Sequence, residues 1–186
     1  MGGMKLTALP LPGLVRIDTT RVGDERGQFS RIFCEHELAV LRPGLHFTQV
    51  NLSETRYRGT ARGLHYQVPP AAEAKLIRCL RGRVFDVAVD LRSGSPTFLQ
   101  WHALELDAAS ETQVFIPEGF AHGFQALTDD VQLVYFHTAS WQPALERRVH
   151  CDEPKIGVRW PLPLANLSAR DSGAGPLEEA FAGVPV

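Results

Sequence analysis

Three basic side chains stand close together in a stretch that has the pattern of β-strands. The segment ARGLHYQVPPAAEAKLIRCLRG covers residues 61–82 and carries Arg62, His65 and Lys75 among apolar neighbours. Basic side chains are rarely buried without a partner. These three therefore either point at solvent or line a cavity that uses positive charge and a proton acceptor.

Other residues could carry acid–base chemistry, although each has an ordinary structural reading. His122 follows a turn at Gly119 in IPEGFAHGF, and any single one of the seven histidines is more often structural or exposed than catalytic. Tyr135 is either a strand aromatic or, in a pocket with cations, a general acid. Asp171 in LSARDSG is either a simple cap or a carboxylate that orients a histidine.

Arginine and tryptophan side chains offer binding chemistry as well. Arg26, Arg62 and Arg170, with Lys75, would by default form a solvated face. Arginine is also the preferred partner of phosphate, because its planar fork binds two oxygens at once. Trp141 is either a core plug or a platform on which a flat ligand ring stacks.

The segment PEGFAH, residues 117–122, matches half of the metal-binding pattern of many cupin barrels. The other half should be an HxH pair followed by a glutamate, but Gln67 stands where the second histidine would be. Zinc, iron or manganese would need about three imidazole or carboxylate ligands at one point. We therefore expect a barrel without a metal rather than a metal-dependent cupin dioxygenase.

The elements that must position these residues are mostly strands separated by turns. Six segments read as strands: residues 46–55, 74–80, 84–92, 101–107, 112–117 and 131–140. In the third of them Phe85, Val87 and Val89 share one face, and the residues between them share the other. Turns are expected at 81–82 and 128–130. This spacing is typical of an antiparallel sandwich or barrel.

Helices are expected only at residues 34–41 and 175–183. The second segment has a proline, Pro176, at the expected helix start and carries acids in its first turn, which suits the helix dipole.

Composition sets the broad class. The chain has 186 residues, 44% of them hydrophobic, with a net charge of −2, so we expect one domain over residues 1–186 and no nucleic-acid partner. No apolar run is long enough to cross a membrane. The three cysteines, Cys34, Cys79 and Cys151, have no paired or metal-like spacing, which favours free thiols and a cytoplasmic location.

Taken in order, several segments resemble the dTDP-4-dehydrorhamnose 3,5-epimerase family. They are DERGQF, TQVNLS, RGLHYQ, KLIRCLRGRVFDVAVDLRSGSPTF, IPEGFAHGF, YFHTASWQPALE, IGVRWP and LSARD. The resemblance implies an all-β, cupin-like jelly-roll barrel with short flanking helices. It also implies a homodimer that uses no metal and no cofactor.

The resemblance assigns catalytic roles to four residues, His65, Asp171, Tyr135 and Lys75, and places His122 beside them as a substrate-binding residue. His65 would be the general base and Asp171 its carboxylate partner, while Tyr135 would be the acid. Lys75 and His122 would face the 4-keto oxygen of the sugar or its neighbours.

The resemblance also implies a set of substrate-binding residues. They are Arg26, Gln49, Asn51, Arg62, His122, Trp141, Glu146 and Arg170. Three positions depart from the family pattern: Trp141 replaces a tyrosine that stacks on thymine, Arg31 replaces an acid, and Arg170 replaces a lysine. These departures leave the nucleotide preference open.

The predicted reaction inverts C3 and C5 of dTDP-4-dehydro-6-deoxyglucose to give dTDP-4-dehydro-L-rhamnose, in deoxysugar biosynthesis. The base would take a proton next to the keto group, and the acid would return one from the opposite face. The alternatives are an epimerase acting at C3 or C5 only, a sugar-nucleotide ketoisomerase, and a binder without catalysis. The presence of Tyr135 together with His65 and Asp171 argues against the last two.

Overall fold

The computed structural model describes residues 3–186 and is almost entirely made of β-strands. The first strands are β1 (Met4–Ala8), β2 (Val15–Thr19), β3 (Val22–Asp24), β4 (Gly27–Phe29), β5 (Gln49–Thr55), β6 (Ala61–Gln67) and β7 (Lys75–Arg81). They are followed by β8 (Arg83–Asp90), β9 (Trp101–Asp107), β10 (Thr112–Ile116), β11 (Phe120–Ala126), β12 (Val131–His137) and β13 (Glu146–Arg148). Two short helices are α1 (Glu35–Leu38) and α2 (Ala169–Ser172).

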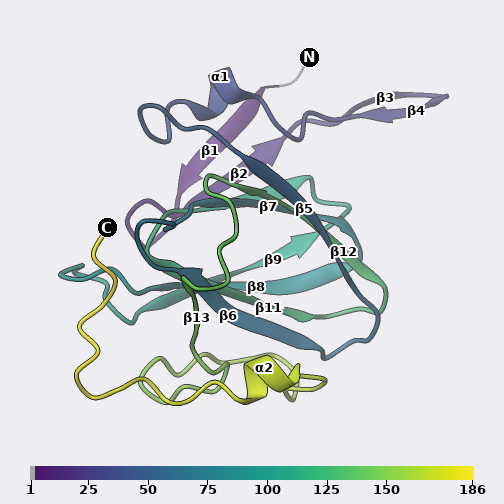
Figure 1. Cartoon of the computed structure of the whole chain (residues 1–186). Coiled ribbons are helices and arrows are strands. Elements are labelled where there is room, and N and C mark those ends of the chain that lie inside the picture. The colour runs from purple at the N-terminus through teal and green to yellow at the C-terminus, as the bar shows by residue number, and fades with distance from the viewer. Residues whose placement is uncertain (1–2) are drawn as a thin grey trace.

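Two antiparallel sheets face each other as a jelly-roll barrel (Figure 1). One has six strands in the order β1-β2-β10-β7-β12-β5, and the other has five in the order β13-β6-β11-β8-β9. Strands β3 and β4 form a separate hairpin that projects away from the barrel. The predicted all-β, cupin-like barrel with short flanking helices is confirmed.

Each of the six predicted strand segments overlaps a strand, and both predicted turns are present. The turn at 81–82 joins β7 to β8, and these strands pair with different neighbours in opposite sheets. Gly82 has a φ of 74° there, and a Cβ on it would lie 2.5 Å from the Thr128 hydroxyl. A glycine is therefore required where the chain passes from one sheet to the other.

The predicted division of β8 into two faces is confirmed. Val84 and Ala88 join the apolar core between the sheets, which also contains Ile77 and Leu133. Phe85, Val87 and Val89 belong to a second cluster outside the five-stranded sheet, which the C-terminal segment covers. A third cluster lies outside the six-stranded sheet, beneath α1. Because both outer faces are covered, several strands are apolar along most of their length.

One predicted helix is present and the other is wrong. The segment 34–41 contains α1, but 175–183 is not helical. There Leu177 and Phe181 pack against the outer cluster, and the Leu177 backbone N–H donates to Glu153. These tertiary contacts outweigh the weak helix preference of a nine-residue segment. The last helix is instead α2, six residues earlier.

Candidate active site

A cavity of about 230 Å³ opens between the two sheets. Strands β5, β6, β7, β11 and β12 contribute to its wall, together with residues after β12. Arg62, His65 and Lys75 all line it. These three side chains therefore share one cavity, with Lys75 buried in it and Arg62 also exposed to solvent.

His65 and Asp171 form a hydrogen-bonded pair at this cavity. The His65 Nε2 lies 2.6 Å from Asp171 Oδ1, although the two residues are 106 positions apart in the chain. Helix α2 holds the carboxylate in place, since the Ser168 hydroxyl accepts a hydrogen bond from the Asp171 backbone N–H. Burial tends to raise the pKa of Asp171, but the hydrogen bond from His65 lowers it below its ordinary value. The carboxylate is therefore ionised and holds the Nε2 proton, which leaves the Nδ1 lone pair of His65 available as a base.

A second pair lies beside the first. His122 Nε2 is 2.8 Å from Asp86 Oδ2, and both side chains are almost completely buried. In the pairing of β11 with β6, His122 stands opposite His65. Two glycines allow this close approach: a Cβ on Gly63 would lie 2.6 Å from the Gly123 Cα.

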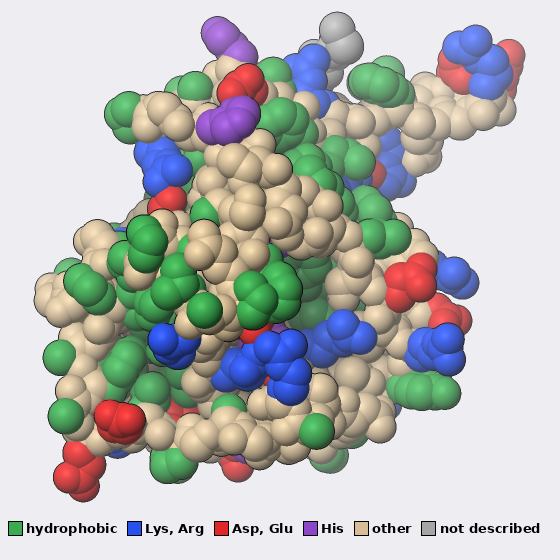
Figure 2. Space-filling model, viewed as in Figure 1, with side chains coloured by type: hydrophobic (Ala, Val, Ile, Leu, Met, Phe, Trp, Pro, Cys, Tyr) green, Lys and Arg blue, Asp and Glu red, His purple; other side chains and the backbone are tan. Residues whose placement is uncertain are grey.

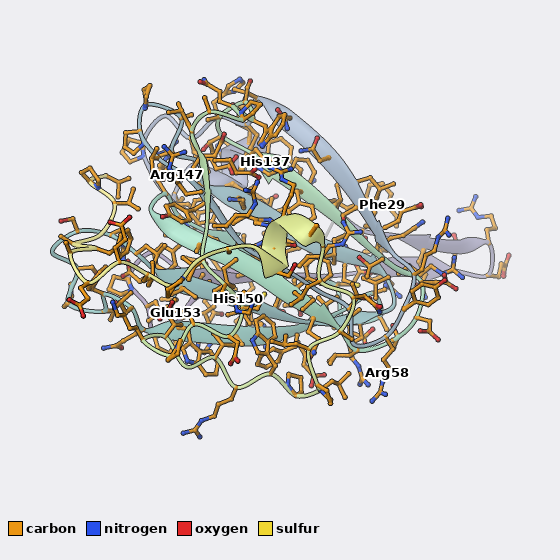
Figure 3. All side chains as sticks on the ribbon, turned by 60° about the horizontal axis from the view of Figure 1, so that its bottom comes forward. Phe29, Arg58, His137, Arg147, His150 and Glu153 are labelled. Carbon is orange, nitrogen blue, oxygen red and sulfur yellow. The ribbon has the colours of Figure 1, made fainter. Side chains whose placement is uncertain are left out.

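Lys75 has a carboxylate partner of its own. Its Nζ lies 2.8 Å from Glu73 Oε1, and the other oxygen of Glu73 accepts a hydrogen bond from His137 Nδ1 at 2.9 Å. Asn51 Nδ2 lies 3.3 Å from the Nε2 of the same imidazole. This cluster forms the wall of the cavity on the side of the six-stranded sheet, and Figure 3 shows His137 among the strands of the barrel.

Tyr135 comes from the sheet opposite His65. It stands on β12 of the six-stranded sheet, whereas His65 stands on β6 of the five-stranded sheet, and both line the cavity. Its ring centroid is 5.8 Å from that of His122 and 5.9 Å from that of His137. Burial, with the charge of Asp86, raises the pKa of Tyr135 well above its ordinary value. The phenol is therefore protonated and able to donate.

The mouth of the cavity is aromatic and basic. Trp141 is about half exposed there, and Gln49 Oε1 accepts its backbone N–H at 3.1 Å. A neighbouring hollow of about 350 Å³ is lined by Arg62, Arg148 and Arg170. Figure 2 shows Lys and Arg side chains gathered across this face of the molecule.

Glu146 connects the two hollows. Its carboxylate accepts hydrogen bonds from Arg170 at 2.6 Å and from Arg148, and it lines both the cavity and the hollow. It therefore holds two guanidinium groups beside the mouth.

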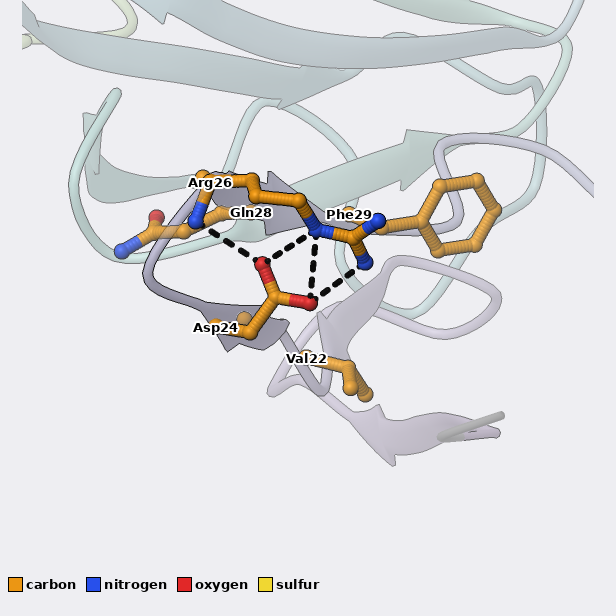
Figure 4. Close-up of a pocket in the computed structure, with 7 residues that line it drawn as sticks. Val22, Asp24, Arg26, Gln28 and Phe29 are labelled. Carbon is orange, nitrogen blue, oxygen red and sulfur yellow. Dashed lines mark hydrogen bonds and ion pairs between the residues drawn. The ribbon is translucent and has the colours of Figure 1, made fainter.

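Arg26, predicted to bind the phosphate group, does not line the cavity of its own chain. It lies at the tip of the β3–β4 hairpin, where its side chain is 85% exposed and bonds to Asp24 (Figure 4). Arg31, one of the three departures from the family pattern, follows this hairpin and pairs with Glu37 of α1 instead of facing the cavity.

The structure brings together the remaining predicted residues and adds several that sequence reasoning missed. Glu73, Asp86, His137 and Arg148 all belong to the site or hold its side chains. Alternation along the strands offered a signal for two of them. Asp86 shares a face with Val84, and His137 lies two residues after Tyr135 and therefore on the same face.

Within residues 3–186, no group of three or more His, Cys, Asp or Glu side chains is arranged to hold a metal ion. None of the helices described is long and apolar enough to cross a membrane.

Comparison with known proteins gives consistent matches across the chain. Residues 8–179 match the family model described as dTDP-4-dehydrorhamnose 3,5-epimerase. A protein of that name from Pseudomonas aeruginosa is 41% identical over 181 residues, covering 96% of this chain and 97% of the relative. A dTDP-4-dehydrorhamnose 3-epimerase from Streptomyces niveus is 39% identical over 179 residues, covering 95% and 86%.

Solved structures agree with these matches. The crystal structure of dTDP-6-deoxy-D-glucose-3,5-epimerase from Legionella pneumophila, in complex with dTDP-4-keto-L-rhamnose, superposes with a TM-score of 0.92. It is 36% identical, and the match covers 98% of each chain.

Proposed function

This chain belongs to the dTDP-4-dehydrorhamnose 3,5-epimerase family, and from that premise we propose how its cavity works. Its reaction is the inversion of C3 and C5 of dTDP-4-dehydro-6-deoxyglucose to give dTDP-4-dehydro-L-rhamnose. The observation that supports the assignment of residues is that two cavity-lining side chains able to transfer protons stand on opposite sheets. His65, paired with Asp171, and Tyr135 face one cavity from its two walls.

The C–H bonds at C3 and C5 are acidic because each lies next to the 4-keto group. In this proposal the neutral imidazole of His65 takes the proton from carbon. Asp171 holds the ring orientation and stabilises the imidazolium that forms, since its carboxylate lies 2.6 Å away and is ionised.

Removal of the proton places negative charge on the 4-oxygen as an enolate. Lys75 and His122 are the groups that would meet this charge, because both line the cavity and both are held by buried carboxylates. Donors fixed in advance stabilise a developing oxyanion with little reorganisation during the reaction.

Tyr135 returns a proton to the same carbon from the opposite wall, which inverts the centre. Burial keeps its phenol protonated. After this transfer Tyr135 is a transient phenolate, which nearby positive charge must stabilise. The charge of Arg62 favours the phenolate, because it lowers the pKa of Tyr135. No redox carrier is needed in this scheme.

The mouth of the cavity suits the dTDP group. Trp141 presents an exposed indole on which the thymine ring of dTDP stacks in this proposal. Arg62, Arg148 and Arg170 surround the adjoining hollow. Bidentate arginine contacts suit a diphosphate. Asn51, Gln49 and Glu146 complete the polar wall or hold its members in place.

We also propose that the chain, with its epimerase domain over residues 1–186, forms a homodimer. The projecting hairpin exposes Val22 and Phe29, and the edge strand β5 exposes Val50 and Leu52. Edge strands with exposed apolar side chains favour association with another chain. In a dimer the hairpin of one copy is free to reach the other, which is where Arg26 would meet a diphosphate.

Size-exclusion chromatography with light scattering, which gives the mass of the protein in solution, tests the dimer. We expect the mass of two chains, and we expect Leu52→Lys to shift the protein toward one chain. A wild-type protein that elutes with the mass of one chain would overturn the proposal.

The three free thiols fit a cytoplasmic location.

Solvent-deuterium exchange tests the function itself. The protein is incubated with dTDP-4-dehydro-6-deoxyglucose in deuterated water, and C3 and C5 are followed by NMR. Label at both carbons with inverted product is the expected result, and treatment with a chelator should leave the rate unchanged. Label at one carbon only would make the protein a mono-epimerase, like the Streptomyces niveus relative in name. The absence of label at either carbon would exclude this substrate.

A further inference from the structure

Glu73 joins two residues of the cavity wall, Lys75 and His137. It lies in the loop between β6 and β7 and is buried against the cavity wall. One of its oxygens lies 2.8 Å from the Lys75 ammonium, and the other accepts the His137 Nδ1 proton at 2.9 Å. A single carboxylate therefore fixes a cation on β7 and an imidazole on β12.

The carboxylate is ionised. Burial tends to raise the pKa of Glu73, but the hydrogen bond from His137 and the charge of Lys75 lower it to about 2. The Lys75 side chain is only 7% exposed, and a buried ammonium without a counter-charge is costly. Glu73 is the carboxylate that the structure places within ion-pair distance of it.

His137 is held at both nitrogens. Asn51 Nδ2 can only donate, so Nε2 of His137 accepts and the ring proton is on Nδ1, directed at Glu73. The imidazole lies nearly parallel to the Tyr135 ring, with an angle of 15° between the planes and 5.9 Å between the centroids. His137 therefore forms a fixed wall against one face of the phenol.

We propose that Glu73 is a positioning residue that fixes the oxyanion-stabilising ammonium of Lys75 and, through His137, the proton-returning ring of Tyr135. The inference rests on the proposed epimerase function and goes beyond it, since neither Glu73 nor His137 carries a chemical step. Both act through neighbours whose placement within about 1 Å governs the rate.

The two arms of this cluster predict different defects. Loss of the Lys75 arm weakens enolate formation, so proton exchange at carbon should slow. Loss of the Tyr135 arm leaves the enolate to be reprotonated from the side of His65, so exchange should continue while inversion declines. The ratio of inversion to exchange therefore separates the arms, and a general loss of stability would not change it.

The experiment measures deuterium exchange at C3 and C5 and the yield of inverted product in the same sample. Glu73→Ala should slow exchange by about 100-fold. Glu73→Gln keeps the shape and a hydrogen bond, so it should slow exchange by about tenfold, and it serves if Glu73→Ala does not fold. His137→Ala should keep exchange close to wild type and lower the ratio of inversion to exchange by about tenfold.

His137→Phe is the conservative variant for the second arm. It retains a flat ring against Tyr135 and should restore most of the inversion that His137→Ala loses. Glu111→Gln is the matched control: Glu111 is also buried and pairs with Arg21 and Arg78, but it does not line the cavity. It should lower stability without altering exchange or the ratio.

Three results would overturn the proposal while leaving the function intact. The first is that the Glu73 and His137 variants show the same exchange rate and the same yield of inverted product as the Glu111→Gln control. Another is faster exchange in Glu73→Ala, which would mean that removing the counter-charge from Lys75 outweighs holding it in place. The third is a His137→Phe protein that inverts no better than His137→Ala. A wild-type protein without any exchange would instead refute the function.

Discussion

The two histidine–aspartate pairs of the cavity have the same chemistry and different surroundings. His65–Asp171 and His122–Asp86 have nitrogen–oxygen distances of 2.6 and 2.8 Å, and the two histidines stand opposite each other on β6 and β11. The His65 side chain is 36% exposed, whereas that of His122 is 6% exposed. The carboxylates are buried in both pairs.

This difference in access supports the proposed roles of the two histidines. An imidazole that takes a proton from carbon must be reached by the substrate, and the exposed edge of His65 permits that. An imidazole enclosed by its neighbours keeps one orientation, and because the Nε2 of His122 is bonded to Asp86, His122 would donate to the 4-oxygen from a protonated Nδ1. In the proposed mechanism, therefore, the base belongs to the open pair and the group that meets the 4-oxygen belongs to the closed pair.

The largest expected effect comes from the open pair. His65→Ala should slow exchange at both carbons by about 10⁴-fold, because the base that removes the proton is lost. Added imidazole should recover part of the rate, since the space left by the ring is open to the cavity. Wild-type turnover in His65→Ala, measured by NMR in deuterated water, would refute the mechanism.

The closed pair should give a smaller effect of a different kind. His122→Ala should slow the reaction by about 10²- to 10³-fold, the usual cost of losing one oxyanion donor. Imidazole should not rescue it, because the vacated space is enclosed. Rescue of both variants to a similar extent would show that the two histidines do not differ in access.

Exchanging each aspartate for asparagine sharpens the comparison. Asp171→Asn should slow exchange by about 10- to 100-fold, because the imidazolium of His65 loses its counter-charge. Asp86→Asn should mainly lower the free energy of unfolding, by about 1–3 kcal/mol, because a buried hydrogen bond is weakened. Urea denaturation and deuterium-exchange rates on both variants measure the two effects. Slower deuterium exchange in Asp86→Asn than in Asp171→Asn would reverse the proposed roles of the two pairs.

Sequence alone predicted much of the fold because strand alternation and turns are local signals. The faces of β8 follow directly from period two, and its outward residues pack as that period requires. The helix expected at 175–183 failed for the opposite reason: Leu177 and Phe181 are held by contacts with distant strands, which no local pattern reports.

The candidate site divides in the same way. The family resemblance supplied His65, Tyr135 and Asp171, and the structure brings them to one cavity or its edge. The family resemblance did not supply Glu73 and His137, whose pairing joins a loop to a strand 64 positions later. The position of Arg26 on a projecting hairpin was not predictable, because its motif gives a residue type but not the direction in which a hairpin projects.

The third histidine–carboxylate pair extends the comparison to stability, where the expected effect is smallest. Glu73 has a pKa of about 2 in the folded protein, against an ordinary value of 4.5. A carboxyl group whose pKa is lower in the folded than in the unfolded protein stabilises the fold at pH values above the unfolded-state pKa. That stabilisation is lost as the pH falls toward and through the folded-state pKa. Between pH 7 and pH 3 the wild type should therefore lose about 2 kcal/mol of unfolding free energy that Glu73→Gln does not lose.

Urea denaturation of wild type and Glu73→Gln at the two pH values measures this difference. Asp171→Asn should show a smaller difference, because its carboxylate starts from a lower ordinary pKa and its histidine partner is more open to water. An equal loss in wild type and Glu73→Gln would assign acid sensitivity to other carboxylates with pKa values of about 2. Asp90, bonded to Arg92, and Glu111 are the two that the structure offers, and neither lines the cavity.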